Sequence, residues 1–307
     1  MFDRELVACS SCPHACAANR IMGKHGFCEA DAGINVAAVV IHHGEEPVIS
    51  GAQGICNVFF RHCNLRCLYC QNHQISQGKM DVGFDIYRNT EDVIDAVVQA
   101  LDQGCPNLGF VSPSHMLPQM KRIIQGVQDR GYRPVIVYNT NAYDRVEMIH
   151  EMADMVDVWL PDFKYMDASL ASSWSGAADY PQVALSALKA MYQHAGSTLR
   201  IENGIAVKGM IIRHLVLPGA VENSLEVLET IARHLSTDVT LSLMSQYYPN
   251  AFTAHHPLLG RTLRQEEYAV VVEKLESLGF YKGWVQELTS HEFYRPDFNN
   301  EEPFQVP

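Results

Sequence analysis

The sequence lacks the features that would direct a chain to a membrane or to secretion. Its 307 residues contain no run of about eighteen apolar residues, the minimum for a helix that crosses a bilayer. The first residues, Met-Phe-Asp-Arg-Glu-Leu, contain no basic stretch followed by an apolar one, so a secretion signal is not predicted. We therefore expect a cytoplasmic protein without a membrane partner.

Positive charge is also scarce. The chain has 23 Lys and Arg residues against 35 Asp and Glu residues, which gives a formal net charge of −12. Nucleic-acid binding depends on clustered Lys and Arg side chains against phosphates, so no nucleic-acid partner is expected. With 47% hydrophobic and 19% charged residues, the chain can bury a large core and is not disordered.

Cysteine is plentiful, but its distribution does not favour disulfides. The count of nine is odd, and seven of the nine fall into two tight groups. Together with the missing secretion signal, this pattern indicates metal binding in a reducing compartment.

The most informative group has the spacing Cys63-x3-Cys67-x2-Cys70. Three thiolates within eight residues can bind an iron–sulfur cluster, yet no further cysteine follows until Cys105. A [4Fe–4S] cluster held here would keep one iron without a protein ligand, open to a cofactor or substrate.

Zinc is the alternative occupant of this loop. Because zinc takes four nitrogen or sulfur ligands, His62 or His73 would have to complete the site. The spacing favours the cluster over this mixed zinc site.

The second group supplies four thiolates within about thirty residues: Cys9, Cys12, Cys16 and Cys28. Four thiolates make a closed site, for which a structural zinc ion is the favoured occupant and an auxiliary iron–sulfur cluster the alternative. Burial alone cannot stabilise so short a segment. We expect a cysteine-rich metal-binding segment at 1–35 and a larger unit at 36–307.

Short apolar strands and amphipathic helices alternate through most of the chain. Strands are predicted at 57–60, 107–111, 134–138, 156–160, 210–217 and 239–245, and helices at 90–103, 117–129, 144–153, 182–194, 224–234 and 264–278. Residues 34–58 predict hairpin-like structure before the first of these strands. The alternation indicates an α/β fold, a partial (β/α)6 TIM-like barrel, followed by a C-terminal extension.

Polar residues gather in the loops after successive strands. These loops are Ser112–His115, Asn139–Asn141, Pro161–Lys164, Pro218-Gly219 and Gln246–Tyr248. In barrels of parallel strands the loops at the carboxyl ends carry the chemistry, so the active site is expected there.

These motifs together resemble the radical S-adenosylmethionine (SAM) superfamily. Within it, the chain is similar to the pyruvate formate-lyase activating enzyme-like branch, in an uncharacterised subgroup with an N-terminal four-cysteine segment. The resemblance rests on the stretches 63–72, 160–164, 212–218 and 243–247. It implies a radical SAM partial barrel, one [4Fe–4S] cluster bound by the 63–70 cysteines, and SAM on the open iron.

The resemblance also implies the residues that contact SAM, which are Tyr69, Thr140, Asn141, Asp162, Lys164 and Arg213. Asp162 and Lys164 match an Asp-x-Lys pair that meets the methionine moiety. Two departures stand out. A Gly-Gly-Glu motif is replaced by Ser-Pro-Ser-His after Val111, and Asn139 and Ala142 replace the Asp and Gly of a monovalent-cation site. No catalytic residue is assigned.

The resulting hypothesis is an oxidoreductase that cleaves SAM reductively to a 5′-deoxyadenosyl radical and abstracts hydrogen from a substrate. Its substrate is either a glycyl-radical enzyme, which it would activate, or a small molecule or peptide. An electron donor such as flavodoxin or ferredoxin is then required, and the oxygen lability of an open cluster implies an anaerobic host. A zinc-stabilised binding protein on the same barrel, without turnover, is the alternative from another class.

Overall fold

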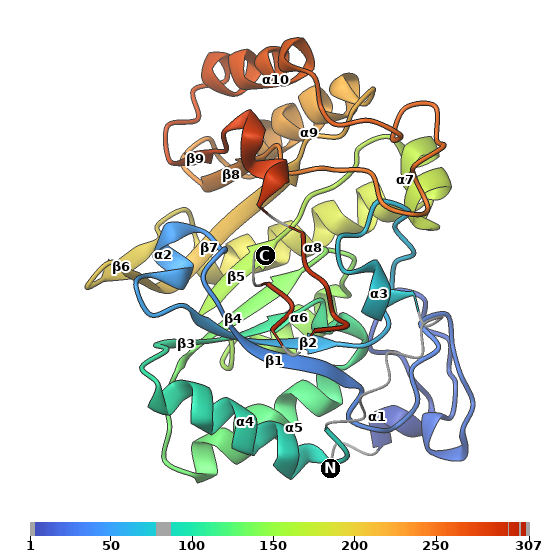
Figure 1. Cartoon of the computed structure of the whole chain (residues 1–307), viewed down its shortest axis with the longest axis vertical. Helices are drawn as coiled ribbons and strands as arrows, with labels where there is room; N and C mark the ends of the chain where they lie inside the picture. Colours follow the sequence, from blue (N-terminus) through green and yellow to red (C-terminus); the bar gives the residue numbers. More distant parts are fainter. Residues whose placement is uncertain (1–3, 78–86, 294, 301, 305–307) are drawn as a thin grey trace.

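The computed structural model describes residues 4–77, 87–293, 295–300 and 302–304, and its centre is a mostly parallel sheet flanked by helices (Figure 1). Along the sheet the order is β1-β2-β3-β4-β5-β7-β8-β9, with β6 attached to β7. The strands are β1 (Val36–His42), β2 (Ile55–Phe60), β3 (Asn107–Val111), β4 (Val135–Thr140), β5 (Val158–Pro161), β6 (Arg200–Glu202), β7 (Ile205–Leu215), β8 (Thr240–Met244) and β9 (Gly283–Val285).

Helices connect the parallel strands and cover the sheet. They are α1 (Arg4–Val7), η1 (Arg20–Met22), α2 (Pro47–Ser50), α3 (His73–Ser76), α4 (Thr90–Asp102), η2 (Pro113–His115), α5 (Leu117–Asp129), α6 (Val146–Met152), α7 (Ala168–Ser175), α8 (Tyr180–Ala195), α9 (Val221–His234), α10 (Gln265–Ser277) and η3 (Leu288–Glu292). In Figure 1, α4 and α5 lie below β1 to β4, whereas α9 and α10 lie beyond β8 at the top.

The predicted fold class is confirmed. The six predicted strands correspond to β2, β3, β4, β5, β7 and β8, which pair in parallel in that order. β1 pairs antiparallel with β2, in agreement with the hairpin-like structure expected before the first parallel strand. This is the arrangement of a partial barrel that begins at β1 and ends at β9.

Among the boundaries that differ from the prediction, two have identifiable local reasons. The helix expected from Asp144 begins at Val146, because the Asp144 carboxylate accepts hydrogen bonds from Tyr138 Oη (2.9 Å) and Thr140 Oγ1 (2.5 Å). The strand expected from Met210 begins at Ile205, because it extends backward into a hairpin with β6.

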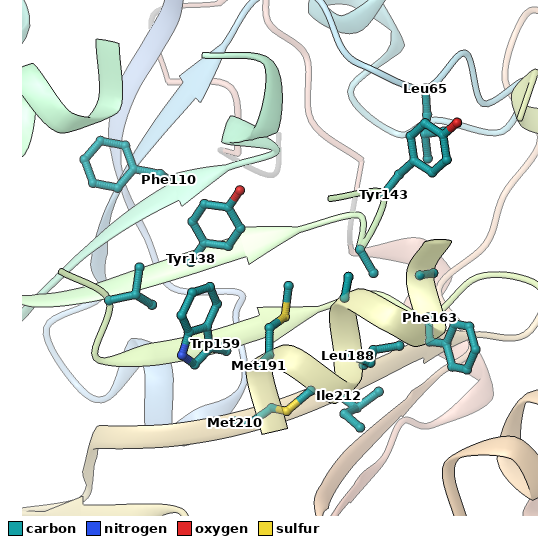
Figure 2. Packing of buried hydrophobic residues seen from close by; sticks show 14 of the residues in the cluster. Leu65, Phe110, Tyr138, Tyr143, Trp159, Phe163, Leu188, Met191, Met210 and Ile212 are labelled. Carbon is teal, nitrogen blue, oxygen red and sulfur yellow. The ribbon is translucent and has the colours of Figure 1, made fainter. Parts of the chain in front are cut away.

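Buried side chains on α8 join β5 to β7. Leu188 and Met191 lie over Trp159 of β5 and over Met210 and Ile212 of β7 (Figure 2). Each of these residues is at most 3% exposed, and burial of a large apolar side chain stabilises the fold by about 1.5 to 3 kcal/mol. This packing fixes the strand end from which the 162–164 loop begins.

The chain returns to the first strands at its C-terminus. Residues 295–300 and 302–304, here termed the C-terminal segment, descend from η3 across the front of the sheet (Figure 1). The ring centroid of Phe298 lies 5.4 Å from that of Phe59 in β2, and the Phe304 ring lies 4.1 Å from His42 in β1. The segment therefore connects the β9 side of the partial barrel to its β1 side.

Across the residues that the structure describes, no helix combines the length and apolar character that a membrane crossing requires.

Candidate functional site

The carboxyl ends of the strands open onto a cavity of about 400 Å³. The predicted residues that line it are Cys63, Cys67, Tyr69, Cys70, Asn141, Asp162, Lys164 and Arg213. They come from the loops after β2, β4 and β5 and from β7 itself. The fold thus brings together side chains that lie up to 150 residues apart, at the end of the sheet where an active site was expected.

Backbone hydrogen bonds hold the cysteine loop against the end of α7. Arg66 N donates to Ser175 O (3.0 Å), and Leu68 N donates to Trp174 O (2.8 Å). Leu65 and Tyr69 are buried at 2% and 5% exposure, so apolar side chains anchor the loop on its inner side. The three thiols are therefore carried by a fixed loop, not by a free one.

Each thiol also accepts a hydrogen bond from one side chain. These bonds run from Asn141 Nδ2 to Cys63 Sγ (3.4 Å), from Ser175 Oγ to Cys67 Sγ (3.0 Å) and from Ser76 Oγ to Cys70 Sγ (3.3 Å). Hydrogen bonds to a free cysteine sulfur favour the thiolate over the thiol. Hydrogen bonds to the sulfurs of an iron–sulfur cluster favour the reduced form of the cluster.

The electrostatic surroundings of these thiols fit a bound metal cluster. Burial raises the pKa of Cys63, Cys67 and Cys70, that of Cys70 to about 11, while Lys164 acts in the opposite direction on all three. Thiolates in such a place need a strong positive charge next to them, which bound iron supplies. The donor set, three thiols and no fourth cysteine on the cavity wall, fits a cluster with one open iron.

The zinc alternative finds little support in the geometry. His73 points its Nδ1 at the carbonyl oxygen of Cys70 (3.2 Å), and His62 does not line the cavity. Neither of the two histidines considered for a zinc site therefore belongs to the cavity wall.

Asp162 and Lys164 form an ion pair on the cavity wall. Lys164 Nζ lies 2.7 Å from Asp162 Oδ2, and Arg213 Nε donates to Asp162 Oδ1 (2.7 Å). Although burial alone would raise it, Arg213 and Lys164 hold the pKa of Asp162 below its ordinary value. The pair is partly accessible, with 19% of the Asp162 and 15% of the Lys164 side chain exposed.

Arg213 is engaged on every nitrogen of its guanidinium. Besides the bond to Asp162, Nη1 donates to Glu45 Oε2 (2.9 Å) and Nη2 donates to Asn139 Oδ1 (2.6 Å). This arrangement fixes the Asp162 carboxylate and leaves Arg213 less suited to clamp a separate anion than an unpaired arginine would be.

Glu45 and Glu46 are site residues that the sequence reasoning missed. Both line the cavity from the turn before α2, and no described residue provides a hydrogen-bond partner for the buried Glu46 Oε2. Burial raises the pKa of Glu46, whereas Arg213 opposes that change. The acidic pair directly before Pro47, which opens α2, was the only local signal, and it is common at the first turn of surface helices.

Thr140 and Asn141 are placed differently from each other. Thr140 is 1% exposed and donates through Oγ1 to Asp144, so it supports the loop from behind the cavity wall. Asn141 lines the cavity and donates to both Cys63 Sγ and Asn64 Oδ1 (2.8 Å).

The far end of the chain supplies a wall that no sequence motif indicated. Trp284 of β9, Gln286, and Pro296 and Phe304 of the C-terminal segment all line the cavity. The N-terminal cysteines, by contrast, line a separate and much smaller cavity.

Comparison with protein families gives a match over more than half of the chain. The model of the radical SAM superfamily matches residues 57–244, a range that includes the cysteine loop and the strands from β2 to β8.

Two curated relatives resemble the chain along most of its length. An uncharacterised protein of Methanocaldococcus jannaschii is 27% identical over 274 residues, which cover 87% of this chain and 74% of that protein. The 7-carboxy-7-deazaguanine synthase of Methanopyrus kandleri is 25% identical over 252 residues, which cover 71% of this chain and 94% of the synthase.

Among solved structures, Streptococcus suis SuiB bound to its precursor peptide SuiA is similar with a TM-score of 0.48 and 11% identity. The match covers 75% of this chain but only 48% of SuiB, so the chain spans about half the length of that protein.

Proposed function

The chain belongs to the radical SAM superfamily, and from this membership we propose that it cleaves SAM reductively and abstracts hydrogen from a substrate. The superfamily implies a [4Fe–4S] cluster and SAM. The single observation that carries the proposal is the loop after β2, where three thiols of the C-x3-C-x2-C spacing face one cavity beside Asp162 and Lys164.

Cys63, Cys67 and Cys70 are proposed as the protein ligands of the cluster. When bound, such a cluster supplies one electron to SAM, which yields methionine and the 5′-deoxyadenosyl radical. The protein contributes by fixing the thiols, excluding bulk water and orienting the cofactor.

Asp162 and Lys164 are proposed to hold the two ends of the methionine moiety. The carboxylate can accept from an ammonium group, and the lysine can pair with a carboxylate, so their present ion pair would be exchanged for two charge-assisted bonds. Arg213 keeps Asp162 in place, and Tyr69, Asn141 and Thr140 shape the loops around the cofactor. These roles are supported by the shared cavity and by the hydrogen bonds described above.

For the substrate, activation of a glycyl-radical enzyme is one candidate, and modification of a small molecule or peptide is the other. The motifs that resemble activating enzymes support the first. The relative that is named a 7-carboxy-7-deazaguanine synthase supports the second. Either reaction needs an electron donor of the flavodoxin or ferredoxin type.

Electron paramagnetic resonance (EPR) of the anaerobically reconstituted and reduced protein tests the cofactor part of the proposal. We expect a [4Fe–4S] signal that changes when SAM is added, because SAM occupies the open iron. Cys63→Ala should lose this signal. Failure to take up iron at the three cysteines, or an EPR signal that does not change when SAM is added, would instead support a binding protein on the same barrel.

A second experiment separates the two substrate candidates. Candidate glycyl-radical enzymes are mixed with the reduced protein and SAM, and a glycyl-radical doublet is sought by EPR. Its appearance supports the activase. Persistent absence, with deuterium entering 5′-deoxyadenosine from a labelled metabolite or peptide, supports the second candidate.

A further inference from the structure

Two adjacent carboxylates stand at the inner end of the large cavity, in the turn between β1 and α2. Just after this turn, Ile49 of α2 is fully buried and packs with Leu160 of β5 and Ile211 of β7. Side chains two residues apart on a strand share a face, so Asp162 and Arg213 lie on the same side as these apolar residues, one step closer to the strand ends. The packing of α2 therefore holds Glu45 and Glu46 beside the polar layer of the cavity.

Glu45 is fully engaged by its neighbours. Its Oε1 accepts from Asn57 Nδ2 (3.1 Å) and Asn139 Nδ2 (3.2 Å), and its Oε2 accepts from Arg213 Nη1 (2.9 Å). Three strands thus donate to one carboxylate. We infer that Glu45 organises the polar layer and has no oxygen to offer to a ligand.

Glu46 is in a different situation. It is only 8% exposed, and the described chain offers its Oε2 no hydrogen-bond partner. Arg213 Nη1 lies 4.0 Å from this oxygen and already donates to Glu45. Burial raises the pKa of Glu46, whereas the charge of Arg213 and a hydrogen bond from Ser242 act in the opposite direction. One carboxylate oxygen on the cavity wall is therefore left for a donor from outside the chain.

The charged side chains on the cavity wall do not balance. Among the described residues they are two cations and three carboxylates: Lys164, Arg213, Asp162, Glu45 and Glu46. Bound SAM would not cancel the excess of negative charge, because its sulfonium charge is matched by the net charge of about −1 of an oxidised [4Fe–4S] core held by three thiolates. A buried carboxylate without a counter-charge is unfavourable, so the cavity favours a further cation.

Aromatic rings line the same side of the cavity. The Phe304 ring lies 4.1 Å from His42 and 5.3 Å from Phe59, and Trp284 of β9 adds a further ring to the wall. Burial lowers the pKa of His42 to about 4, so this histidine is neutral at pH 7 and supplies no positive charge. Because the faces of aromatic rings attract cations, these walls and Glu46 favour the same kind of ligand.

An organic cation fits this place better than a metal ion. The N–H groups of Asn57, Asn139 and Arg213 point at Glu45 and would repel a metal ion bound there. Mg²⁺ and Ca²⁺ need several oxygen ligands, and Glu46 is the one carboxylate of the pair that keeps an unused oxygen. A nitrogen cation needs only one such oxygen for a charge-assisted hydrogen bond.

We propose that the substrate is a small organic cation, whose ammonium or amidinium group donates to Glu46 and packs between the aromatic rings of the cavity. The size of the cavity supports a small molecule, because its volume of about 400 Å³ must also hold SAM, and a single drug-sized ligand fills about 300 to 1,000 Å³. This inference rests on the proposed function and narrows its substrate candidates.

Binding of a model cation to the reconstituted protein tests the inference. Benzamidinium is titrated calorimetrically under anaerobic conditions with saturating SAM, which keeps Asp162 occupied. Benzamide has nearly the same shape without the charge and is the matched ligand. We expect the native chain to bind benzamidinium at least tenfold more tightly than benzamide, and Glu46→Gln to lose this preference. Equal binding of the two ligands, or an unchanged preference in Glu46→Gln, would overturn the proposal.

Two further variants make the assignment specific. Glu202→Gln removes an exposed carboxylate on β6 and should keep the preference for benzamidinium. Phe304→Leu leaves the carboxylates intact and should weaken benzamidinium binding about two- to fivefold, the scale of one cation–π contact. It provides a second test should Glu46→Gln fail to fold. Unchanged affinity for benzamidinium in Phe304→Leu would contradict the proposed aromatic site.

The affinity for SAM, measured on the same proteins, separates this inference from the proposed function. A native chain whose EPR signal does not respond to SAM would contradict the proposed function itself. A native chain that binds SAM but does not prefer benzamidinium would contradict only the inference about the substrate. Loss of SAM affinity in Glu46→Gln as large as that in Lys164→Ala would assign Glu46 to the cofactor and also overturn the inference.

Discussion

Lys164 is the residue through which the proposed contact with SAM is most simply tested. Lys164→Ala should weaken SAM binding by about 1 to 3 kcal/mol, the cost of a charge-assisted hydrogen bond left unmade, while the iron content stays normal. Equilibrium binding of SAM to the reconstituted protein measures the effect. Lys208→Ala, on the exposed hairpin of β6 and β7, is the matched control. Unchanged affinity in Lys164→Ala would remove this residue from the cofactor site.

Ser175 tests whether hydrogen bonds to sulfur tune the proposed cluster at Cys63, Cys67 and Cys70. Its hydroxyl lies 3.0 Å from Cys67 Sγ, so Ser175→Ala removes a bond that favours the reduced cluster. A net hydrogen-bond energy of about 0.5 to 1.5 kcal/mol corresponds to a midpoint potential lower by about 20 to 65 mV. A redox titration followed by EPR measures it. Ser173→Ala, exposed on the same helix, should leave the potential unchanged, and equal values for all three proteins would contradict the role.

Residues in dense local motifs were predictable from the sequence, and residues brought in by the fold were not. The spacing of Cys63, Cys67 and Cys70 indicated a cluster loop, and the Asp-x-Lys motif directly after a strand indicated Lys164. Glu45 and Ser175 carry no such mark, because an acidic pair before a helix and a serine at a helix end are common everywhere. Only the tertiary structure places Glu45 against Arg213 and Ser175 against a thiol.

His214 connects three elements of the barrel and predicts a pH dependence. From β7, its Nδ1 donates to the carbonyl oxygen of Phe163 (2.7 Å), and its Nε2 lies 2.9 Å from Ser224 Oγ of α9. In the neutral ring Nε2 can accept from the serine hydroxyl, and burial favours this neutral form. Burial, together with the charge of Lys164, lowers the pKa of His214 to about 4, although the hydrogen bond to Phe163 O and the charge of Asp162 act in the opposite direction.

The sign of the effect follows from this lowered pKa. Between pH 6.5 and 4 the unfolded chain takes up a proton at this histidine and the folded chain does not, so stability falls with falling pH. At pH 5 the lowered pKa of His214 reduces the free energy of unfolding by about 2 kcal/mol. The free energy of unfolding should therefore fall less between pH 7 and pH 5 in His214→Gln than in the native chain. The difference between the two proteins should be about this amount. Identical losses in the two proteins would show that the histidine is not held neutral.

Elements with regular apolar spacing were predicted well, and elements without it were missed. The helices α4 and α5 and the strand β3 have the expected bounds within a residue, because their apolar spacing is regular. The hairpin of β6 and β7 was missed although the pair Asn203-Gly204 is a common sequence signal for a two-residue hairpin turn. Both residues have the positive φ that such a turn requires. α7 and β9 are short and carry little periodic signal, so packing against neighbouring elements decides their structure.

At the level of the whole chain, the C-terminal segment is predicted to keep the cavity wall in place. Phe298 is 5% exposed and packs on Phe59, so Phe298→Ala should cost about 3 kcal/mol and release the segment. Limited proteolysis should then remove the C-terminus faster. Phe293→Ala is the control, because this ring is 63% exposed just outside the segment. Equal cleavage rates in both variants would show that Phe298 does not anchor it.

The organisation of the whole molecule links the N-terminal cysteines to the barrel. Contacts such as Arg145 Nη1 to Ser10 O (2.8 Å) and Gln119 Nε2 to Gly33 O (3.0 Å) join the first residues to the loops and helices that follow. The division at residue 35 stays a prediction. These long-range contacts depend on polar side chains with no local pattern, so the sequence alone could not reveal them.

Formation of 5′-deoxyadenosine tests the central claim most directly. The reconstituted protein is incubated anaerobically with SAM and dithionite, and the nucleoside is quantified by chromatography. We expect 5′-deoxyadenosine and methionine from the native chain, and neither product above background from Cys67→Ala. A native chain that holds its [4Fe–4S] cluster and binds SAM, yet yields no 5′-deoxyadenosine, would contradict the proposed reaction.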